Sequence, residues 1–331
     1  MNINSSNDRE RIFSSPYFIY SLLILFVLFS AWLLLFHGGP VPLGNNDYDA
    51  VILWQIRWPK LIASLLVGAS LGLSGYVFQS VLRNPMSDPY VLGVSSGSAL
   101  AVAAMLVFLP TVSIFKMEAA SFIGALFAVF ILLLLFRLLV SSSLVIILIG
   151  IGLSFFFSSV ITALMSYMEG GKLVYMNSWL VGNVSQPDMP QLYFLGSIFL
   201  VVLILTLLFS NVLDVIQFGE DLSVTSGVNH KFFSMLFIVA ASLVTAASVT
   251  VCGTIGFVGL VVPHIIRLLF RGRSVQMIPL IVIMGAGFLT FCTAIAGMLS
   301  FSFEVPSGAV TAFIGAPVLL YLIYRRYKVM Q

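Results

Sequence analysis

The sequence predicts an all-α integral membrane protein with about ten transmembrane helices. Composition is the first reason, because 60% of the 331 residues are hydrophobic and only 8% are charged, whereas soluble domains carry roughly 25% charged residues. Arrangement is the second, since the charges lie between long apolar runs and the mean hydropathy is +1.12. Length is the third, because about ten runs of about 20 residues with short loops account for the whole chain as one domain.

Each apolar run bounded by polar breaks is an expected helix. The runs are 17–36, 61–81, 90–109, 119–138, 143–166, 191–210, 232–250, 254–270, 275–299 and 308–324. The first run is longer than the apolar part of a signal peptide, and no small-x-small site follows Phe36, so an uncleaved helix is expected. The eighth contains several glycines and Pro263, which predicts a short or broken helix.

The positions of lysine and arginine predict that both termini are cytoplasmic, because cytoplasmic loops are enriched in these residues. If 1–16 is an inner tail, the inner side holds Arg9, Arg11, Arg83, Arg137, Lys231, Arg267, Arg271, Arg273, Arg325, Arg326 and Lys328. The outer side holds only Arg57, Lys60, Lys116 and Lys172. The outer stretch 167–191 and the inner stretch 211–231 are long enough to contain short helices.

Several classes of function lose support from what the sequence lacks. The expected spans have no acidic residue near their centres, whereas proton- and sodium-driven transporters keep ionisable groups there. There is no GxxxxGK[ST] phosphate loop, so any ATPase must be a separate polypeptide. His37, His230 and His264 are far apart and without carboxylates at ligand spacing, which predicts neither a metal site nor an enzyme. The scattered basic residues form no nucleic-acid-binding stripe.

Small residues recur at helical spacing within the spans. Gly68 and Gly72 are followed by Gly75, and Gly93 and Gly97 repeat the four-residue interval in the next span. Such spacing lets helix backbones approach closely in lipid. It indicates tight helix packing, either as ordinary membrane packing or around a translocation path.

Three sequence blocks resemble one known family. The first runs from Arg57-Trp58-Pro59-Lys60 through Gln79 to Arg83-Asn84-Pro85-Met86-Ser87-Asp88-Pro89 and Gly93. The second is Gly253-Thr254-Ile255-Gly256-Phe257-Val258-Gly259 with Pro263-His264 and Arg267, and the third is Glu304-Val305-Pro306-Ser307-Gly308. In order and spacing they resemble the type II ABC importer permeases for iron–siderophore, haem and cobalamin uptake, the FecCD/BtuC-like family.

The resemblance implies a permease domain that works with partners in the bacterial inner membrane. Those partners are a second permease copy, two cytoplasmic ATPase subunits that bind ATP and Mg, and an extracytoplasmic binding protein. The chain itself would be no enzyme and would hold no cofactor. The expected cargo is an iron(III)–siderophore-type chelate moved by alternating access, with cobalamin or haem as alternatives. An ATP-independent secondary transporter is the alternative from another class.

The resemblance also implies roles for particular residues. Gly219, Glu220, Asp221 and Gly227 match the family's ATPase-coupling segment within 211–231, for which the alternative is an amphipathic linker. The structural motif positions are Gln79, Asn84, Pro85, Pro89, Gly93, Gly256, Pro263, His264, Arg267, Glu304 and Pro306.

Two further groups of residues, one basic and one of serines, each allow two interpretations. Arg57 and Lys60 match positions that dock the binding protein, although both side chains could instead anchor at lipid headgroups. A further basic residue of this docking pattern is replaced by Gly297. Ser141, Ser142 and Ser143 match a cytoplasmic gate, or else form a polar turn between two spans.

Overall fold

The computed structural model describes residues 16–37, 49–90, 92–109, 113–139, 143–185, 187–300 and 304–330, which form helices joined by short connections. The elements are α2 (Pro16–His37), α3 (Asp49–Val51), η1 (Ile52–Arg57), α4 (Trp58–Val81), α5 (Val94–Phe108), α6 (Ile114–Leu139), α7 (Ser143–Met165), α8 (Gly170–Val181), α9 (Met189–Leu208), α10 (Ser210–Phe218), α11 (Glu220–Thr225), α12 (His230–Cys252), α13 (Val258–Leu269), α14 (Ser274–Leu299) and α15 (Ser307–Met330).

The ten predicted runs correspond to ten of these helices. In the described part of the chain, seven helices are long and apolar enough to cross a membrane, and three shorter apolar helices match the third, eighth and tenth runs. The third helix begins at Val94 rather than at residue 90, because Gly93 has a left-handed backbone with a φ of 83°. The eighth, α13, has only 12 residues, which confirms the expectation of a short helix.

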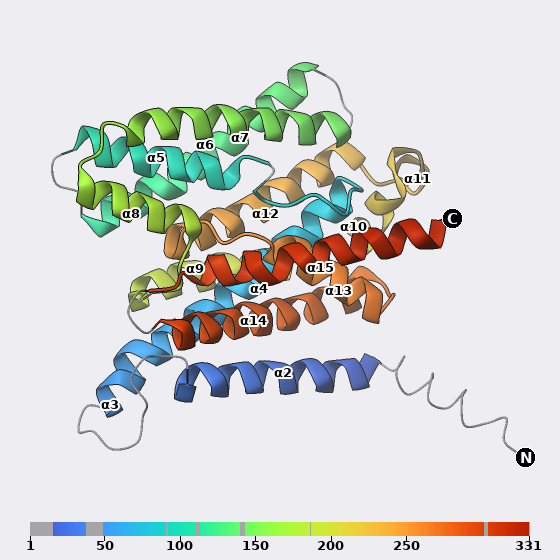
Figure 1. The fold of residues 1–331 in the computed structure, drawn as a ribbon. Helices are drawn as coiled ribbons and strands as arrows, with labels where there is room; N and C mark the ends of the chain where they lie inside the picture. The colour runs from blue at the N-terminus through green and yellow to red at the C-terminus, as the bar shows by residue number, and fades with distance from the viewer. Residues whose placement is uncertain are drawn as a thin grey trace, which may run out of the picture.

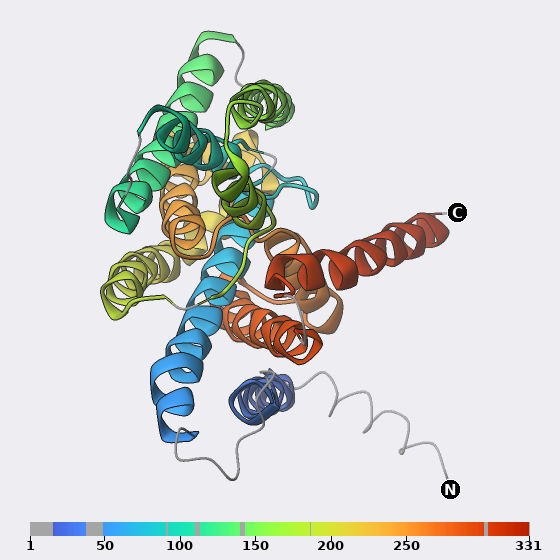
Figure 2. The same cartoon turned by 60° about the vertical axis from the view of Figure 1, so that its left-hand side comes forward.

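Helices α10 and α11 mark one end of the bundle, and α8 lies toward the other end (Figure 1). The first residue of α2 and the last residue of α15 both lie at the end that carries α10 and α11 (Figure 1). The second view shows α2 beside α14, and α15 extending away from the other helices toward its C-terminus (Figure 2). An even number of crossings is the arrangement that returns both described chain ends to one side.

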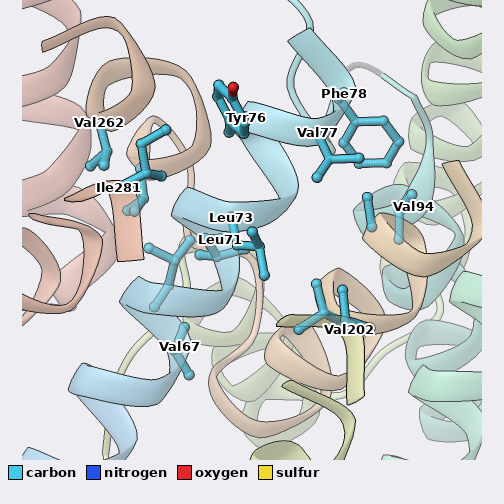
Figure 3. Close-up of a cluster of buried hydrophobic side chains, with 14 of the residues drawn as sticks. Val67, Leu71, Leu73, Tyr76, Val77, Phe78, Val94, Val202, Val262 and Ile281 are labelled. Atoms are coloured by element: carbon cyan, nitrogen blue, oxygen red, sulfur yellow. The ribbon is translucent and has the colours of Figure 1, made fainter. Parts of the chain in front are cut away.

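Helix α4 is the centre of the bundle. In its most apolar stretch, 83% is buried inside the protein, whereas the corresponding stretches of α2, α7 and α9 are each 22% buried. Figure 3 shows α4 between Val262 and Ile281 on one side and Val94 and Val202 on the other. Such a helix must pack on several partners at once, whereas the less buried helices have apolar faces suited to lipid.

The predicted small-residue contacts hold α4 against its neighbours. A Cβ atom added at Gly68 would lie 2.2 Å from the carbonyl oxygen of Gly285 on α14. One added at Gly75 would lie 1.9 Å from the carbonyl oxygen of Gly259 on α13. Because backbone atoms occupy the space that a side chain would need, only glycine permits these helices to approach so closely.

Candidate coupling and translocation site

The stretch 211–231 folds into two short helices, as its length predicted. Gly219 separates α10 from α11 with a φ of 116°, and Gly227 ends the turn after α11 with a φ of 74°. Both are backbone conformations that favour glycine. Glu220 and Asp221 at the start of α11 are exposed. These helices therefore offer a carboxylate-bearing surface at one end of the bundle.

Apolar side chains flank these carboxylates. Phe218 is 75% exposed, Val224 is 65% exposed and Leu222 is 46% exposed. The opposite face of α10 is anchored, because Leu213 and Ile216 are fully buried in the bundle. The segment thus has an inner face that belongs to the bundle and an outer face with the mixed apolar and charged character of a protein contact surface.

The loop between α4 and α5 lies next to this segment. A Cβ atom at Gly219 would lie 2.8 Å from the Nη1 atom of Arg83, which itself has a φ of 51°. Asn84 shapes the loop, since its Oδ1 atom accepts a hydrogen bond from the Met86 backbone N–H at 2.9 Å. Pro85 is half-buried and Pro89 is buried. The first motif block therefore forms a loop in contact with the predicted coupling helices.

Asp88 in this loop is a buried carboxyl group. Burial raises its pKa to about 7, although a hydrogen bond from the Tyr90 backbone opposes the shift. The carboxyl oxygen lies close to Gly259, where a Cβ atom would be 3.2 Å from Oδ1. The loop is thus pressed against the start of α13.

A chain of polar side chains continues from α10 through three spanning helices; we call it the coupling network. Asp214 Oδ1 accepts hydrogen bonds from the backbone N–H and the hydroxyl of Ser274, at 2.9 and 2.5 Å. The hydroxyls of Tyr76 and Ser274 are 2.7 Å apart. The Arg267 guanidinium lies 5.4 Å from the centre of the Tyr76 ring and donates to Gln79 Oε1 at 2.7 Å.

Gln79 of α4 connects this network to the backbone of α13. Its Nε2 atom donates to the carbonyl oxygen of Gly259 at 3.1 Å. The structure thus brings two sequence-predicted motif residues, Gln79 and Arg267, into direct contact. His264 and Pro263 lie on the same helix, half-buried and buried respectively. Within the described residues, no group of three His, Cys, Asp or Glu side chains is arranged to hold a metal ion.

The second and third motif blocks meet at what we call the α8 junction, formed by residues 179–184, 252–257 and 305–308. The Asn183 backbone N–H donates to the Cys252 carbonyl at 2.9 Å, and the Gly308 N–H donates to the Gly182 carbonyl at 3.0 Å. The Thr254 hydroxyl donates to the Leu180 carbonyl. Non-helical backbone between α12 and α13 thereby finds partners inside the protein, as backbone at membrane depth must.

Not every motif residue in these blocks has a close neighbour. A Cβ atom at Gly256 would meet nothing within 4 Å. Pro306 is half-buried beside Ser307, whose hydroxyl accepts from the Val184 N–H at 3.0 Å. No local pattern indicated that this region would join the two blocks, because 74 positions separate Leu180 from Thr254 and 123 separate Val184 from Ser307.

A cavity of about 610 Å³ adjoins the α8 junction. Its lining includes Glu118 of α6, Asp188 before α9, and Glu304. Glu118 accepts a hydrogen bond from the Gln191 side chain, and Asp188 takes part in a capping box with Gln191. Two of these three carboxylates are therefore engaged in positioning α6 and α9.

The two predicted docking residues lie in different environments. Arg57, the last residue of η1, is only 4% exposed and donates to the Leu35 carbonyl near the end of α2 at 2.5 Å. This placement ties the first spanning helix to the second. Lys60 is half-buried within electrostatic reach of Glu304. A docking role therefore remains a prediction that rests mainly on Lys60.

The predicted gate falls largely outside the described residues. Ser141 and Ser142 lie outside them, and Ser143 is described only as the first backbone position of α7. The inner tail that was expected over 1–16 is described only from Pro16 onward. Both assignments stay predictions.

Together, these features define a class: a polytopic helical membrane protein that carries two short helices with exposed carboxylates at one end of its bundle. The chain belongs to the FecCD transport family, whose model matches residues 13–325. It is therefore a non-catalytic, multi-pass transmembrane subunit of an ABC importer, the class whose members work with ATPase and binding-protein partners.

Relatives and solved structures agree with this assignment. The chain is 31% identical to the iron-uptake system permease protein FeuB of Bacillus subtilis, over 95% of each chain. It is 32% identical to the vitamin B12 import system permease protein BtuC of Vibrio cholerae, over 85% of each chain. A solved structure classed as a metal-chelate type ABC transporter, in an inward-facing conformation, is 28% identical with a TM-score of 0.83, covering 94% of this chain and 99% of that one.

Proposed function

We propose that this permease imports iron(III)–siderophore-type chelates across the bacterial cytoplasmic membrane by alternating access. The observation that carries the proposal is the nearly end-to-end match to an iron-uptake permease. Cobalamin is the second candidate, because the chain is 32% identical to a vitamin B12 permease over 85% of each chain, against 31% over 95% for the iron-uptake permease. Haem remains a third chelate of similar size.

The proposed assembly contains two copies of this chain, two ATPase subunits that bind ATP and Mg, and an extracytoplasmic binding protein. Exposed aromatic side chains on α7 and α15, such as Phe155 and Phe313, offer apolar surface for the second copy or for lipid. In the proposed orientation, the side that carries α10, α11 and both described chain ends (Figure 1) faces the cytoplasm, and the bias of basic residues supports this.

In this proposal, α10 and α11 form the contact with the ATPase. The ATPase would offer an apolar groove that takes up Phe218, Leu222 and Val224. Basic residues at the rim of that groove would pair with Glu220 and Asp221. Gly219 and Gly227 would fix the angle of α11 to its neighbours. Lys60 would help to orient the binding protein on the opposite face.

Cargo can be identified by uptake into proteoliposomes that contain this chain, its coexpressed ATPase and its binding protein. Labelled ferric siderophore, cobalamin and haem are offered in parallel, with and without ATP. We expect ATP-dependent entry of the ferric siderophore alone. Entry of cobalamin or haem in its place would reassign the cargo, and entry without ATP would contradict the ATP-driven mechanism.

The ATPase contact can be tested with the double variant Glu220→Lys and Asp221→Lys. Reversing two exposed charges should abolish copurification of the ATPase while the chain still inserts into the membrane. Glu169→Lys is the matched control, because Glu169 is an exposed carboxylate before α8 on the far side of the bundle. Equal copurification by both variants would remove α11 from the contact.

A further inference from the structure

Ser274 is the point where the coupling network leaves the coupling segment and enters the spanning helices. It is the first residue of α14, and the residue before it, Arg273, makes no side-chain cap. The backbone N–H of Ser274, which has no partner within α14, instead donates to the carboxylate of Asp214 on α10. A helix N-terminus favours a negative partner, so α10 supplies the cap of α14.

The hydroxyl of Ser274 uses all of its hydrogen-bonding capacity in this position. It donates to Asp214 at 2.5 Å, and it can accept from Tyr76 at 2.7 Å and from Gln217 at 3.2 Å. Asp214 and Gln217 are three residues apart on α10, and so share one face of that helix. Ser274 and Tyr76 are 0% and 2% exposed, so water does not compete for these bonds.

Beyond Tyr76 the contacts reach the irregular backbone between α12 and α13. Arg267 stacks over the Tyr76 ring and binds Gln79, which binds the carbonyl of Gly259. Gly259 is in turn the residue whose backbone touches Gly75 of α4. A displacement of α10 would therefore act directly on α14. It would reach α4 through Tyr76 and α13 through Arg267.

We propose that Asp214 and Ser274 form the joint through which the coupling segment moves α14, α4 and α13. The proposal rests on the assigned role of α10 and α11 as the ATPase contact. Neither residue lies on the exposed face of α11 that would touch the ATPase, and both are positioning residues. When this joint is broken, the ATPase should stay bound and active, but its movement should no longer move α14, α4 and α13.

The variant that tests the joint is Ser274→Ala, which removes three side-chain contacts and keeps the backbone bond to Asp214. Ser248→Ala is the matched control, because Ser248 is equally buried but its hydroxyl donates only within α12, to Val244. Both variants are assembled with the ATPase and the binding protein. We expect cargo taken up per ATP hydrolysed to fall about tenfold in Ser274→Ala, a typical coupling effect between sites, and to stay unchanged in the control.

A second measurement does not depend on the cargo. Spin labels at Thr225→Cys on α11 and Val275→Cys on α14 report the distance between the coupling segment and the start of α14, both positions being exposed. The native cysteines, Cys252 and Cys292, are buried. In the complex with the ATPase, we expect one narrow distance distribution with and without ATP, and a broadened one once Ser274→Ala or Tyr76→Phe is added.

The outcomes separate the joint from the proposed cargo and contact. Absence of iron-chelate uptake in the unmodified complex would overturn the cargo, while the label distances still test the joint. Distances and transport ratios in Ser274→Ala that equal those in Ser248→Ala would overturn the joint. Loss of ATPase binding in Ser274→Ala would also overturn it, because the residue would then belong to the docking surface.

Discussion

At the α8 junction, chain segments meet through their backbones; in the coupling network, they meet through side chains. Gly182, Gly253 and Gly308 allow carbonyl and amide groups to touch directly, and a Cβ atom at Gly308 would lie 1.9 Å from the Val181 carbonyl oxygen. Around Ser274, by contrast, a carboxylate, a phenol, an amide and a guanidinium span the spaces between helices. Among these helices, α4 and α13 also touch through their backbones, at Gly75 and Gly259.

This difference has a mechanical consequence. Two backbones in contact cannot slide past each other without collision, because neither atom set can rotate out of the way. Hydrogen-bonded side chains instead pass a displacement from one helix to the next, as Asp214 of α10 does to Ser274 of α14. The α8 junction is therefore suited to hold its helices as one body, and the coupling network is suited to transmit movement.

The largest effect is expected at the α8 junction, from Gly308→Val. The added side chain would meet the Val181 and Gly182 carbonyl oxygens, so the start of α15 could not pack and little folded protein should be recovered from detergent. Gly152→Val on α7 is the control, because nothing lies within 4 Å of a Cβ there. Size-exclusion chromatography and thermal unfolding would measure both, and equal recovery would contradict the rigid contact.

The next effect depends on pH and concerns Asp88, in the loop that lies against Gly259 of α13. The pKa of Asp88 is about 7 in the folded protein and near 3.8 without burial. Between these values the folded state holds a proton that the unfolded state has released, so stability falls as pH rises, by up to about 1.4 kcal/mol per unit.

Asp88→Asn should therefore flatten the dependence of the unfolding temperature on pH between about 4 and 7. Asp221→Asn, at an exposed carboxylate, should leave it unchanged. A slope that survives in Asp88→Asn would place the titrating group elsewhere.

A moderate effect is expected from Thr254→Val, which preserves shape but removes the donor to the Leu180 carbonyl. The bond is part-buried, so leaving its acceptor without a donor should cost at most about 1–3 kcal/mol and lower the unfolding temperature. Thr162→Val is the comparison, because Thr162 is exposed and its hydroxyl donates within its own helix. Indistinguishable unfolding temperatures would mean that the junction depends on backbone contacts alone.

The smallest effect is expected from Ser98→Ala, in the contact between α5 and α6. Ser98 and Ser121 share a hydrogen bond of 2.6 Å, but Ser121 keeps a second partner, Thr250, at 3.2 Å. Hydrogen bonds between membrane helices are worth about 0.6 kcal/mol on average. Unfolding in the same detergent should show a change of that order, and a drop as large as that of Thr254→Val would show that a side-chain bond between α5 and α6 matters as much as one at the α8 junction.

Local patterns determined much of this protein. Apolar runs in lipid must become helices, since no other open structure satisfies the backbone, so the ten helices followed from composition and length. The start of α5 was predicted at residue 90 but lies at Val94, because the sequence does not reveal that Gly93 adopts a left-handed backbone. The two short helices of 211–231 were expected because that stretch is long enough to contain them, and their coupling role came only from the family resemblance.

Only the tertiary structure decided which side chains meet. The sequence favoured a docking role for Arg57, with anchoring at lipid headgroups as the alternative. The structure shows that its side chain is 4% exposed and donates to the Leu35 carbonyl of α2. Asp214 and Ser274 carry no motif, and 60 positions separate them. Their contact depends on how α10 packs beneath α14, a long-range arrangement that no local periodicity encodes, because periodicity reports which face of a helix is buried and not what it is buried against.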